Sequence, residues 1–196
     1  MVPFAAATLA LIVALYAVAA LFLGWGLQIS GLVRHSLTQT AMVPATALSF
    51  VFAGLSMITA LSGRVKLSHL LNALLLGLVG LTMMGQVSGW HGPSALFFAQ
   101  TEATERMAMI TALVLVLYVW AANRILKRSF FAVECIGVLG ISAALAITLM
   151  NLTGTTDLPG LSYTAGISLQ TSVLAGLLFL ALSIVAFGDE QETREP

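Results

Sequence analysis

The sequence predicts an all-α polytopic membrane protein, with six transmembrane helices arranged as three parallel two-helix repeats of approximate three-fold pseudosymmetry. Three observations predict this fold: an apolar composition, six apolar segments of membrane-spanning length, and a short sequence phrase that occurs three times. Of the 196 residues, 59% are hydrophobic and only 8% are charged. Soluble domains carry about 25% charged residues, and a soluble fold of this size could not bury so much apolar side chain.

Composition also argues against several functional classes. The formal net charge is zero, so overall charge gives no indication of a nucleic-acid partner. Cys135 is the only cysteine, which excludes a disulfide within the chain and a cysteine-rich metal site, and we expect it to be a small core residue. The sequence contains no nucleophile elbow, zinc-protease motif, phosphate loop or Cys-x-x-Cys motif. We therefore expect neither enzymatic activity nor a cofactor or bound metal.

Six apolar segments are each expected to cross the membrane. Each is close to the roughly 20 residues that a helix needs to cross about 30 Å of hydrocarbon. Helices are expected because lipid offers backbone N–H and C=O groups no other partner. The first segment has no basic residue before it and is too long to be the core of a signal peptide. The predicted spans are about 2–25, 41–61, 67–88, 107–123, 130–150 and 167–187.

The distribution of Lys and Arg predicts the orientation of the chain. Alternate connections on one side, together with the two ends of the chain, hold six of the eight basic residues: Arg64, Lys66, Arg124, Lys127, Arg128 and Arg194. The connections on the other side hold Arg34 and Arg106. The positive-inside rule then places both termini in the cytoplasm. We expect residues 1–188 to form the transmembrane domain and residues 189–196 to form a cytoplasmic tail or the start of a linker.

The phrase that occurs three times indicates an internal repeat. It reads "AMVPATALSFVFAGL" from Ala41, "RMAMITALVLVLYVW" from Arg106 and "GISLQTSVLAGLLFL" from Gly166, so successive copies begin at nearly constant spacing. The copies align two sets of residues: Met42 with Met107 and Ile167, and Thr46 with Thr111 and Thr171. The preceding loops match in length, because the first set is preceded, at one constant distance along the chain, by Trp25, Trp90 and Met150. Period and loop length agree independently, which predicts repeats at about 1–63, 64–128 and 129–188.

Each predicted repeat crosses the membrane twice, so all three share one orientation and their symmetry axis lies along the membrane normal. Small residues should let the helices approach closely, at "GQVSG" (85–89) and in a stripe formed by Ala6, Ala10 and Ala14. Formation of a homodimer through these residues is the alternative. The aligned threonines are expected either to bond to the backbone of their own helix or to join neighbouring helices around the axis.

Few polar residues fall at bilayer depth, where ionisable groups usually indicate function. Glu134 lies about one turn from the cytoplasmic end, near Lys127 and Arg128, and is expected to snorkel or to form an interfacial ion pair. Asn72 is expected to bond to a neighbouring helix. His35 and His91 share the outer side, but two histidines without supporting Asp, Glu or Cys do not define a metal site.

A ligand site is instead predicted at the outer ends of the helices. Polar and aromatic residues cluster there, and aromatic residues at this level serve either as membrane-interface anchors or as the walls of a binding pocket closed by the three outer loops. The candidate ligand-binding residues are Trp25, Gln28, His35, Gln86, Trp90, His91, Tyr163 and Gln170.

The repeated phrase also carries a family resemblance. "TAMVPATALSFVFAGLSMI" and "TERMAMITALVLVLYVWA" resemble the Met-x-x-x-Thr-Ala-Leu segments of MASE-type regions, the N-terminal membrane domains that precede PAS, histidine-kinase or diguanylate-cyclase modules in bacterial sensor proteins. The third copy departs from the pattern. The matching residues are Met42, Thr46, Ala47, Leu48, Arg106, Met107, Thr111, Ala112 and Leu113, and the degenerate ones are Ile167, Thr171, Ser172 and Val173.

The resemblance implies a sensory input domain in the bacterial inner membrane. Such a domain would detect an apolar or small neutral stimulus and pass a helix rearrangement through "FGDEQETREP" to a cytoplasmic signalling module, fused or bound at the C-terminus. Membrane lipid is the other expected partner. The alternative functions are a small transporter or channel for a neutral solute, or an accessory subunit of a larger membrane complex. A water-filled central path would favour transport, whereas a solid apolar centre would favour a sensor or a subunit.

Overall fold

The computed structural model describes residues 2–34, 40–88, 107–126, 130–153 and 166–194, and the part of the chain that it describes is helical. Within these residues, six helices are long and apolar enough to cross a membrane, which matches the predicted number of spans and indicates an integral membrane protein. The helices are α1 (Val2–Ala19) with its π-helical continuation η1 (Ala20–Gly26), the short α2 (Ser30–Val33), α3 (Pro44–Leu61), α4 (Val65–Ser88), α6 (Met109–Leu126), α7 (Phe130–Thr153) and α8 (Leu169–Arg194).

Most helix boundaries differ from the predicted ones by a few residues, and two of the differences are informative. α3 begins at Pro44 rather than at residue 41, because proline lacks a backbone N–H and suits the first helical turn. α8 does not end at residue 187 but continues to Arg194, so residues 189–194, expected as a tail or linker, form its last turns. The "GQVSG" segment extends into Gly89, which lies outside the described residues.

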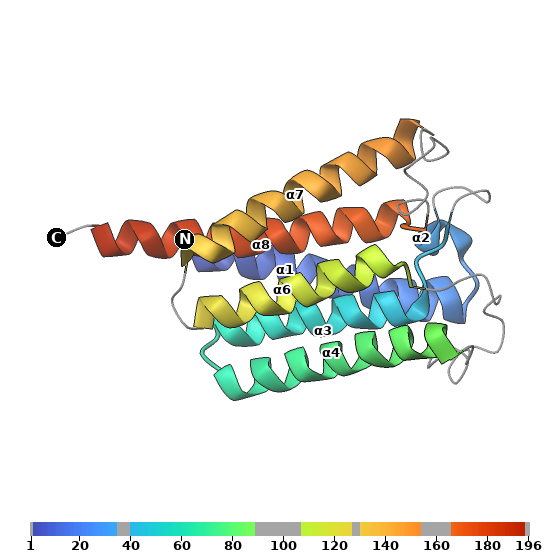
Figure 1. Ribbon diagram of the computed structural model, residues 1–196, viewed down its shortest axis with the longest axis horizontal. Coiled ribbons are helices and arrows are strands. Elements are labelled where there is room, and N and C mark those ends of the chain that lie inside the picture. The colour runs from blue at the N-terminus through green and yellow to red at the C-terminus, as the bar shows by residue number, and fades with distance from the viewer. Residues whose placement is uncertain (1, 35–39, 89–106, 127–129, 154–165, 195–196) are drawn as a thin grey trace.

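The six long helices alternate in direction (Figure 1). α1, α4 and α7 run one way and α3, α6 and α8 run back, so that α1 begins and α8 ends at the same end of the bundle. We call this the inner end, and the opposite end, where α3, α6 and α8 begin, the outer end.

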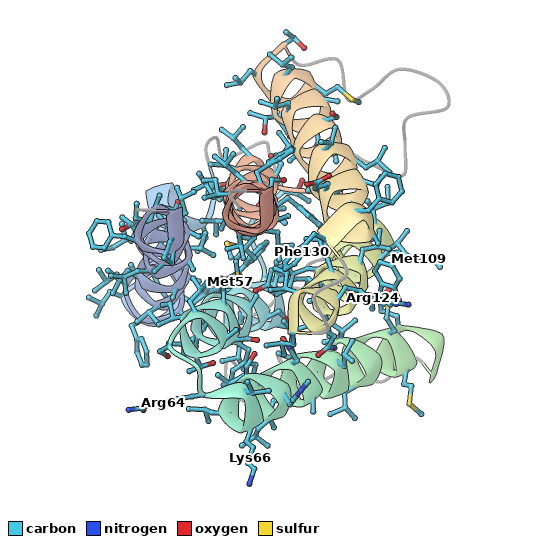
Figure 2. The ribbon with its side chains drawn as sticks, turned by 90° about the vertical axis from the view of Figure 1, so that its left-hand side faces the viewer. Met57, Arg64, Lys66, Met109, Arg124 and Phe130 are labelled. Atoms are coloured by element: carbon cyan, nitrogen blue, oxygen red, sulfur yellow. The ribbon has the colours of Figure 1, made fainter. Side chains whose placement is uncertain are left out.

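The helices form a central group and a peripheral group. α3, α6 and α8 contact one another, whereas α1 lies against α3 and α8, α4 against α3 and α6, and α7 against α6 and α8. Figure 2 shows this arrangement from the inner end, with Arg64 and Lys66 pointing away from the bundle. The membrane-spanning windows of α3 and α8 are 56% buried, compared with 17% for α7.

The centre of the bundle is filled by large side chains. Phe50, Tyr118 and Leu182 come from α3, α6 and α8, and each is at most 1% exposed. The Tyr118 hydroxyl donates a hydrogen bond to the carbonyl of Ala53 at 2.8 Å, which joins α6 to α3. Large apolar side chains such as Phe131, 79% exposed, cover the periphery, as expected for a surface that faces lipid. Cys135 is also exposed, so the prediction of a core position was wrong.

Small residues bring selected helices close together, as predicted. The Ala6, Ala10 and Ala14 stripe is buried, and a Cβ at Gly54 of α3 would lie 2.7 Å from the Ala10 carbonyl oxygen. On α7, Gly137 lies directly against Ser183 of α8. α7 and α8 therefore pack with their backbones close together.

The helix–helix bond predicted for Asn72 is also present. Asn72, Ser56 and Ser68 are all buried between α3 and α4 near the inner end. The Ser56 hydroxyl donates to the Asn72 amide oxygen at 2.7 Å and lies 3.1 Å from the Ser68 hydroxyl oxygen. These contacts fasten α3 to α4 inside the apolar span.

Candidate functional site

Hydrogen bonds at the outer end hold the chain where it enters each central helix. Met42, Met107 and Ile167, the aligned residues that precede α3, α6 and α8, are buried. The carbonyl of each accepts a bond from a side chain at the outer end of the preceding long helix. The bonds run from Trp25 Nε1 to Met42 (2.9 Å), from Gln86 Nε2 to Met107 (2.7 Å) and from Asn151 Nδ2 to Ile167 (3.3 Å). An unpaired carbonyl is costly near lipid, so these contacts stabilise the fold.

These bonds change the interpretation of two predicted ligand-binding residues. The indole N–H of Trp25 and the amide of Gln86 are directed at backbone carbonyls, so they position helices. Gln28 is exposed in the turn between η1 and α2, with a φ of 57°. Gln170 has a buried side-chain oxygen without a hydrogen-bond donor. The remaining predicted residues, His35, Trp90, His91 and Tyr163, lie outside the described residues.

A cavity of about 50 Å³ lies between α6, α7 and α8, near the outer end. Its walls include Ile110 and Val114 from α6, Ala143 and Ala144 from α7, and Ala175 from α8, and Phe50 of α3 closes it towards the centre of the bundle. Ile110 is the second residue of α6, which places the cavity in the outer half of the membrane span. None of these residues was among the predicted ligand-binding set.

The cavity exists because α7 leans away from α6. Both views show the two helices diverging towards the outer end (Figures 1 and 2). α7 instead packs on α8, where the Phe179 ring lies against Gly140 and the Ala144 methyl group lies close to Gly176. Glycine and alanine on this part of α7 are too small to fill the space that opens beside α6.

Hydroxyl groups lie at the edge of the otherwise apolar cavity. Thr111, Thr171 and Ser172 contribute to its lining. The Ser172 hydroxyl donates to the Leu169 carbonyl at 2.8 Å, and its oxygen lies 3.0 Å from the hydroxyl oxygen of Thr148. Such a space suits a small apolar or weakly polar molecule, because it offers no charge to compensate a charged one.

The sequence contained a signal for this cavity that the prediction did not use. Thr111 and Thr171 are aligned members of the repeated phrase, and both line the cavity. Gly140, Ala143 and Ala144 form a cluster of small residues on the neighbouring helix. Repeated hydroxyls opposite small residues could have indicated a space between helices, but sequence alone does not say which helices are neighbours.

Comparison of the chain with protein-family models, with curated proteins and with solved structures gives no match. The resemblance to MASE-type input domains therefore stays a prediction that depends on the repeated phrase. The features that bear on function are the cavity, the helices that line it and the course of those helices beyond the apolar span.

Proposed function

We propose that the chain is a membrane-embedded sensory input domain that binds an apolar or small neutral molecule in the cavity between α6, α7 and α8. One observation carries this proposal: α8 lines the cavity near its start and continues as one helix past the apolar span, which ends at Gly188, to Arg194. Figure 1 shows α8 extending beyond the other helices at the inner end. A movement of α8 at the cavity can therefore reach the inner end through one uninterrupted helix.

A three-unit scaffold supports the proposal. The bounds of α6 and α7 all follow the matching bounds of α3 and α4 at one constant offset, and α8 begins at a slightly shorter offset after α6. The second helix of each unit belongs to the central group, and each is preceded by a side-chain bond to a carbonyl of the repeated phrase. We infer three parallel two-helix units around one axis, with pseudo-three-fold symmetry, of which the third carries the cavity.

A bound molecule would act by favouring one arrangement of α7 over another. A ligand shifts a conformational equilibrium only if it binds the two arrangements with different affinity. The cavity lies where α7 leaves α6, so its volume depends on the position of α7. Because α7 packs closely on α8 through Gly137 and Gly140, a movement of α7 would be transmitted to α8 as a shift of about 1–2 Å.

The charges support a cytoplasmic location for the end of α8. Arg64, Lys66 and Arg124 lie near the inner end, which is where α8 continues beyond the bundle. A bacterial inner membrane with both termini in the cytoplasm, and a signalling partner at the end of α8, is consistent with this arrangement. The filled centre favours a sensor or a subunit over a transporter, and the continuous α8 favours the sensor.

Xenon provides a test, because it enters apolar protein cavities. The chain, carrying Cys135→Ser and spin labels on cysteines placed at positions 66 and 192, would be reconstituted in lipid nanodiscs. We expect xenon to shift the distance between the labels by about 1–2 Å. Ala143→Leu, which adds bulk at the cavity, should abolish the shift. Ala146→Leu, the same change on the same helix but outside the cavity lining, should preserve it.

Two results would contradict the proposal. An identical shift in the Ala143→Leu and Ala146→Leu chains would show that xenon acts through the lipid. Xenon binding at the cavity without a change in the label distance would show that α8 does not respond to the site, and the accessory-subunit alternative would then be preferred.

A further inference from the structure

The aligned threonines of the three repeats share an uncommon hydrogen-bonding position. A threonine in a helix often donates its hydroxyl proton to the backbone carbonyl one turn earlier in the same helix. In each repeat that carbonyl belongs to the aligned residue of the phrase, which is Met42, Met107 or Ile167. Each of these carbonyls already accepts a bond from a side chain of the preceding long helix. The bond that positions each central helix therefore occupies the acceptor that its threonine would otherwise use.

The three threonines differ in what else surrounds them. Thr171 has another partner, because its hydroxyl oxygen lies 2.8 Å from that of Ser168. The Thr46 and Thr111 hydroxyls make no hydrogen bond with a described residue, so neither bond expected from the sequence is present at these two positions. Both side chains are buried, at 2% and 4% exposure, but only Thr111 lines the cavity. Thr111 therefore brings a hydroxyl group without a partner to an open space.

The space beside Thr111 results from small residues that the matching part of α4 lacks. By the repeat offset, three residues of the cavity wall on α7 correspond to three larger residues on α4: Gly140 to Leu75, Ala143 to Leu78 and Ala144 to Val79. The Leu75 and Val79 side chains are buried, so they fill the bundle where α7 leaves room. Thr46 and Thr111 are thus the same position of the repeat in a filled and in an open setting.

The position of Thr111 within α6 indicates which kind of polar group fits beside it. Thr111 is the third residue of α6 and lies in its first turn, where backbone N–H groups have no acceptor within the helix. The helix dipole adds partial positive charge at this end. Both features favour a hydrogen-bond acceptor over a donor. An anion is disfavoured, because the apolar walls offer no charge to compensate the water that it would lose.

We propose that the Thr111 hydroxyl donates a hydrogen bond to the carbonyl oxygen of a small neutral ligand, a ketone or an aldehyde, in the cavity between α6, α7 and α8. The cavity volume of about 50 Å³ is about a third of the roughly 150 Å³ that hold benzene, so the ligand has only a few non-hydrogen atoms. Phe50, Ile110 and Val114 offer apolar walls for its hydrocarbon part. This inference rests on the proposed function, which makes the cavity a ligand site, and adds the chemical class of the ligand and the residue that selects it.

Displacement of xenon by two probes of the same shape tests the selectivity. The chain in lipid nanodiscs would be loaded with xenon, and xenon NMR would follow its displacement by acetone or by isobutene, in which a CH₂ group replaces the carbonyl oxygen. Thr111→Val replaces the hydroxyl by a methyl group. It should weaken acetone binding about three- to tenfold and leave isobutene binding unchanged. Thr46→Val, the same change at the aligned position outside the cavity lining, should alter neither.

Two further variants keep the test decisive if Thr111→Val does not fold. Thr111→Ala should lose the preference for acetone over isobutene, and Thr111→Ser, which keeps the hydroxyl, should retain it. Equal acetone binding by the unaltered chain and the hydroxyl-free variants would overturn the inference, as would an equal loss in Thr46→Val. Acetone binding that depends on Thr111 would support it even if the label distance at the end of α8 did not respond, a result that contradicts only the sensory function.

Discussion

The α3–α4 and α6–α7 hairpins have helices of the same lengths and connections of equal length, yet one is closed and the other is open. In the first hairpin, the Ser56 hydroxyl of α3 bonds to both Ser68 and Asn72 of α4 across the interface. In the second, Ala121 stands at the position that corresponds to Ser56, no such bond is recorded between the described residues of α6 and α7, and the two helices diverge. An identical plan of helix lengths therefore produces two different interfaces.

A few positions account for the difference. The residues of α7 that correspond, by the repeat offset, to Ser68, Asn72 and Leu75 of α4 are Val133, Gly137 and Gly140. The substitution of glycine for asparagine and leucine removes both the polar bond and the bulk that would hold α7 on α6. The same glycines let α7 approach α8 closely. The comparison shows that apolar length and turns set the helices, whereas a small number of side chains decide which neighbour each helix prefers.

The largest expected effect comes from restoring bulk to the open hairpin. Gly140→Leu places a leucine where α4 has Leu75, but the new side chain would overlap the ring of Phe179. Overpacking at such a contact should lower the free energy of unfolding by about 2–3 kcal/mol. The free energy of unfolding can be measured in mixed micelles that contain an increasing fraction of a denaturing detergent. Gly77→Leu on α4 is the control, because a Cβ there meets nothing within 4 Å, and it should be close to neutral.

Equal losses from Gly140→Leu and Gly77→Leu would show that the position of α7 does not depend on its contact with Phe179. A double variant that adds Phe179→Ala gives a further check. It should recover part of the loss caused by Gly140→Leu, because the overlapping ring is gone.

Removal of the asparagine from each hairpin should sharpen the comparison with an intermediate effect. Asn72→Ala deletes the acceptor of the Ser56 hydroxyl and should lower the free energy of unfolding by about 1–2 kcal/mol. Asn123→Ala removes an oxygen without a donor, so we expect a loss of no more than a few tenths of a kcal/mol. Similar losses for the two variants would mean that the closed hairpin does not derive its stability from this bond.

A smaller effect than that of Asn72→Ala is expected at the outer ends, where the two hairpins are most alike. Gln86 and Asn151 occupy matching positions of α4 and α7, and each donates to the carbonyl that precedes the next central helix. Replacement by leucine should cost about 0.6 kcal/mol on average over the two positions. Gln86→Leu should cost more, because its bond is shorter and because Asn151 also donates to Ile147 of its own helix at 3.0 Å. Gln86→Leu should accelerate hydrogen exchange of the amides in the first turn of α6. Asn151→Leu should accelerate exchange in the first turn of α8 by a smaller factor. A larger acceleration for Asn151→Leu would contradict this prediction.

The sequence predicted the helices well because the bilayer imposes a minimum apolar length. All six spans, the start of each central helix near an aligned phrase and the packing of the Ala6, Ala10 and Ala14 stripe follow from local composition. The helical continuation of α8 through residues 189–194 was not predicted, because a polar segment can be helical or extended according to what precedes it.

The candidate site was harder to predict, because it depends on which helices are neighbours. Trp25 and Gln86 were correctly placed at the outer end, but their hydrogen-bond donors reach backbone carbonyls that sequence could not identify. Glu134 was expected to snorkel or to form an ion pair, and the burial of one of its carboxylate oxygens without a partner could not be predicted from its position near the start of the helix. The cavity arises from the divergence of two helices, and the hydroxyl and small residues that line it do not tell, from sequence alone, which helix they face.

The constant offset between the two hairpins has a consequence for how the gene could have grown. Every position in α3 and α4 is separated from its counterpart in α6 and α7 by two complete passes along the bundle. Duplication or loss of such a stretch leaves the direction of all later helices unchanged, whereas gain of a single helix would reverse them. If the two hairpins arose by such a duplication, one of them could accumulate glycine in place of asparagine and leucine while the other continued to hold the bundle together. With such redundancy, one hairpin could lose the contacts between its helices while the other kept them.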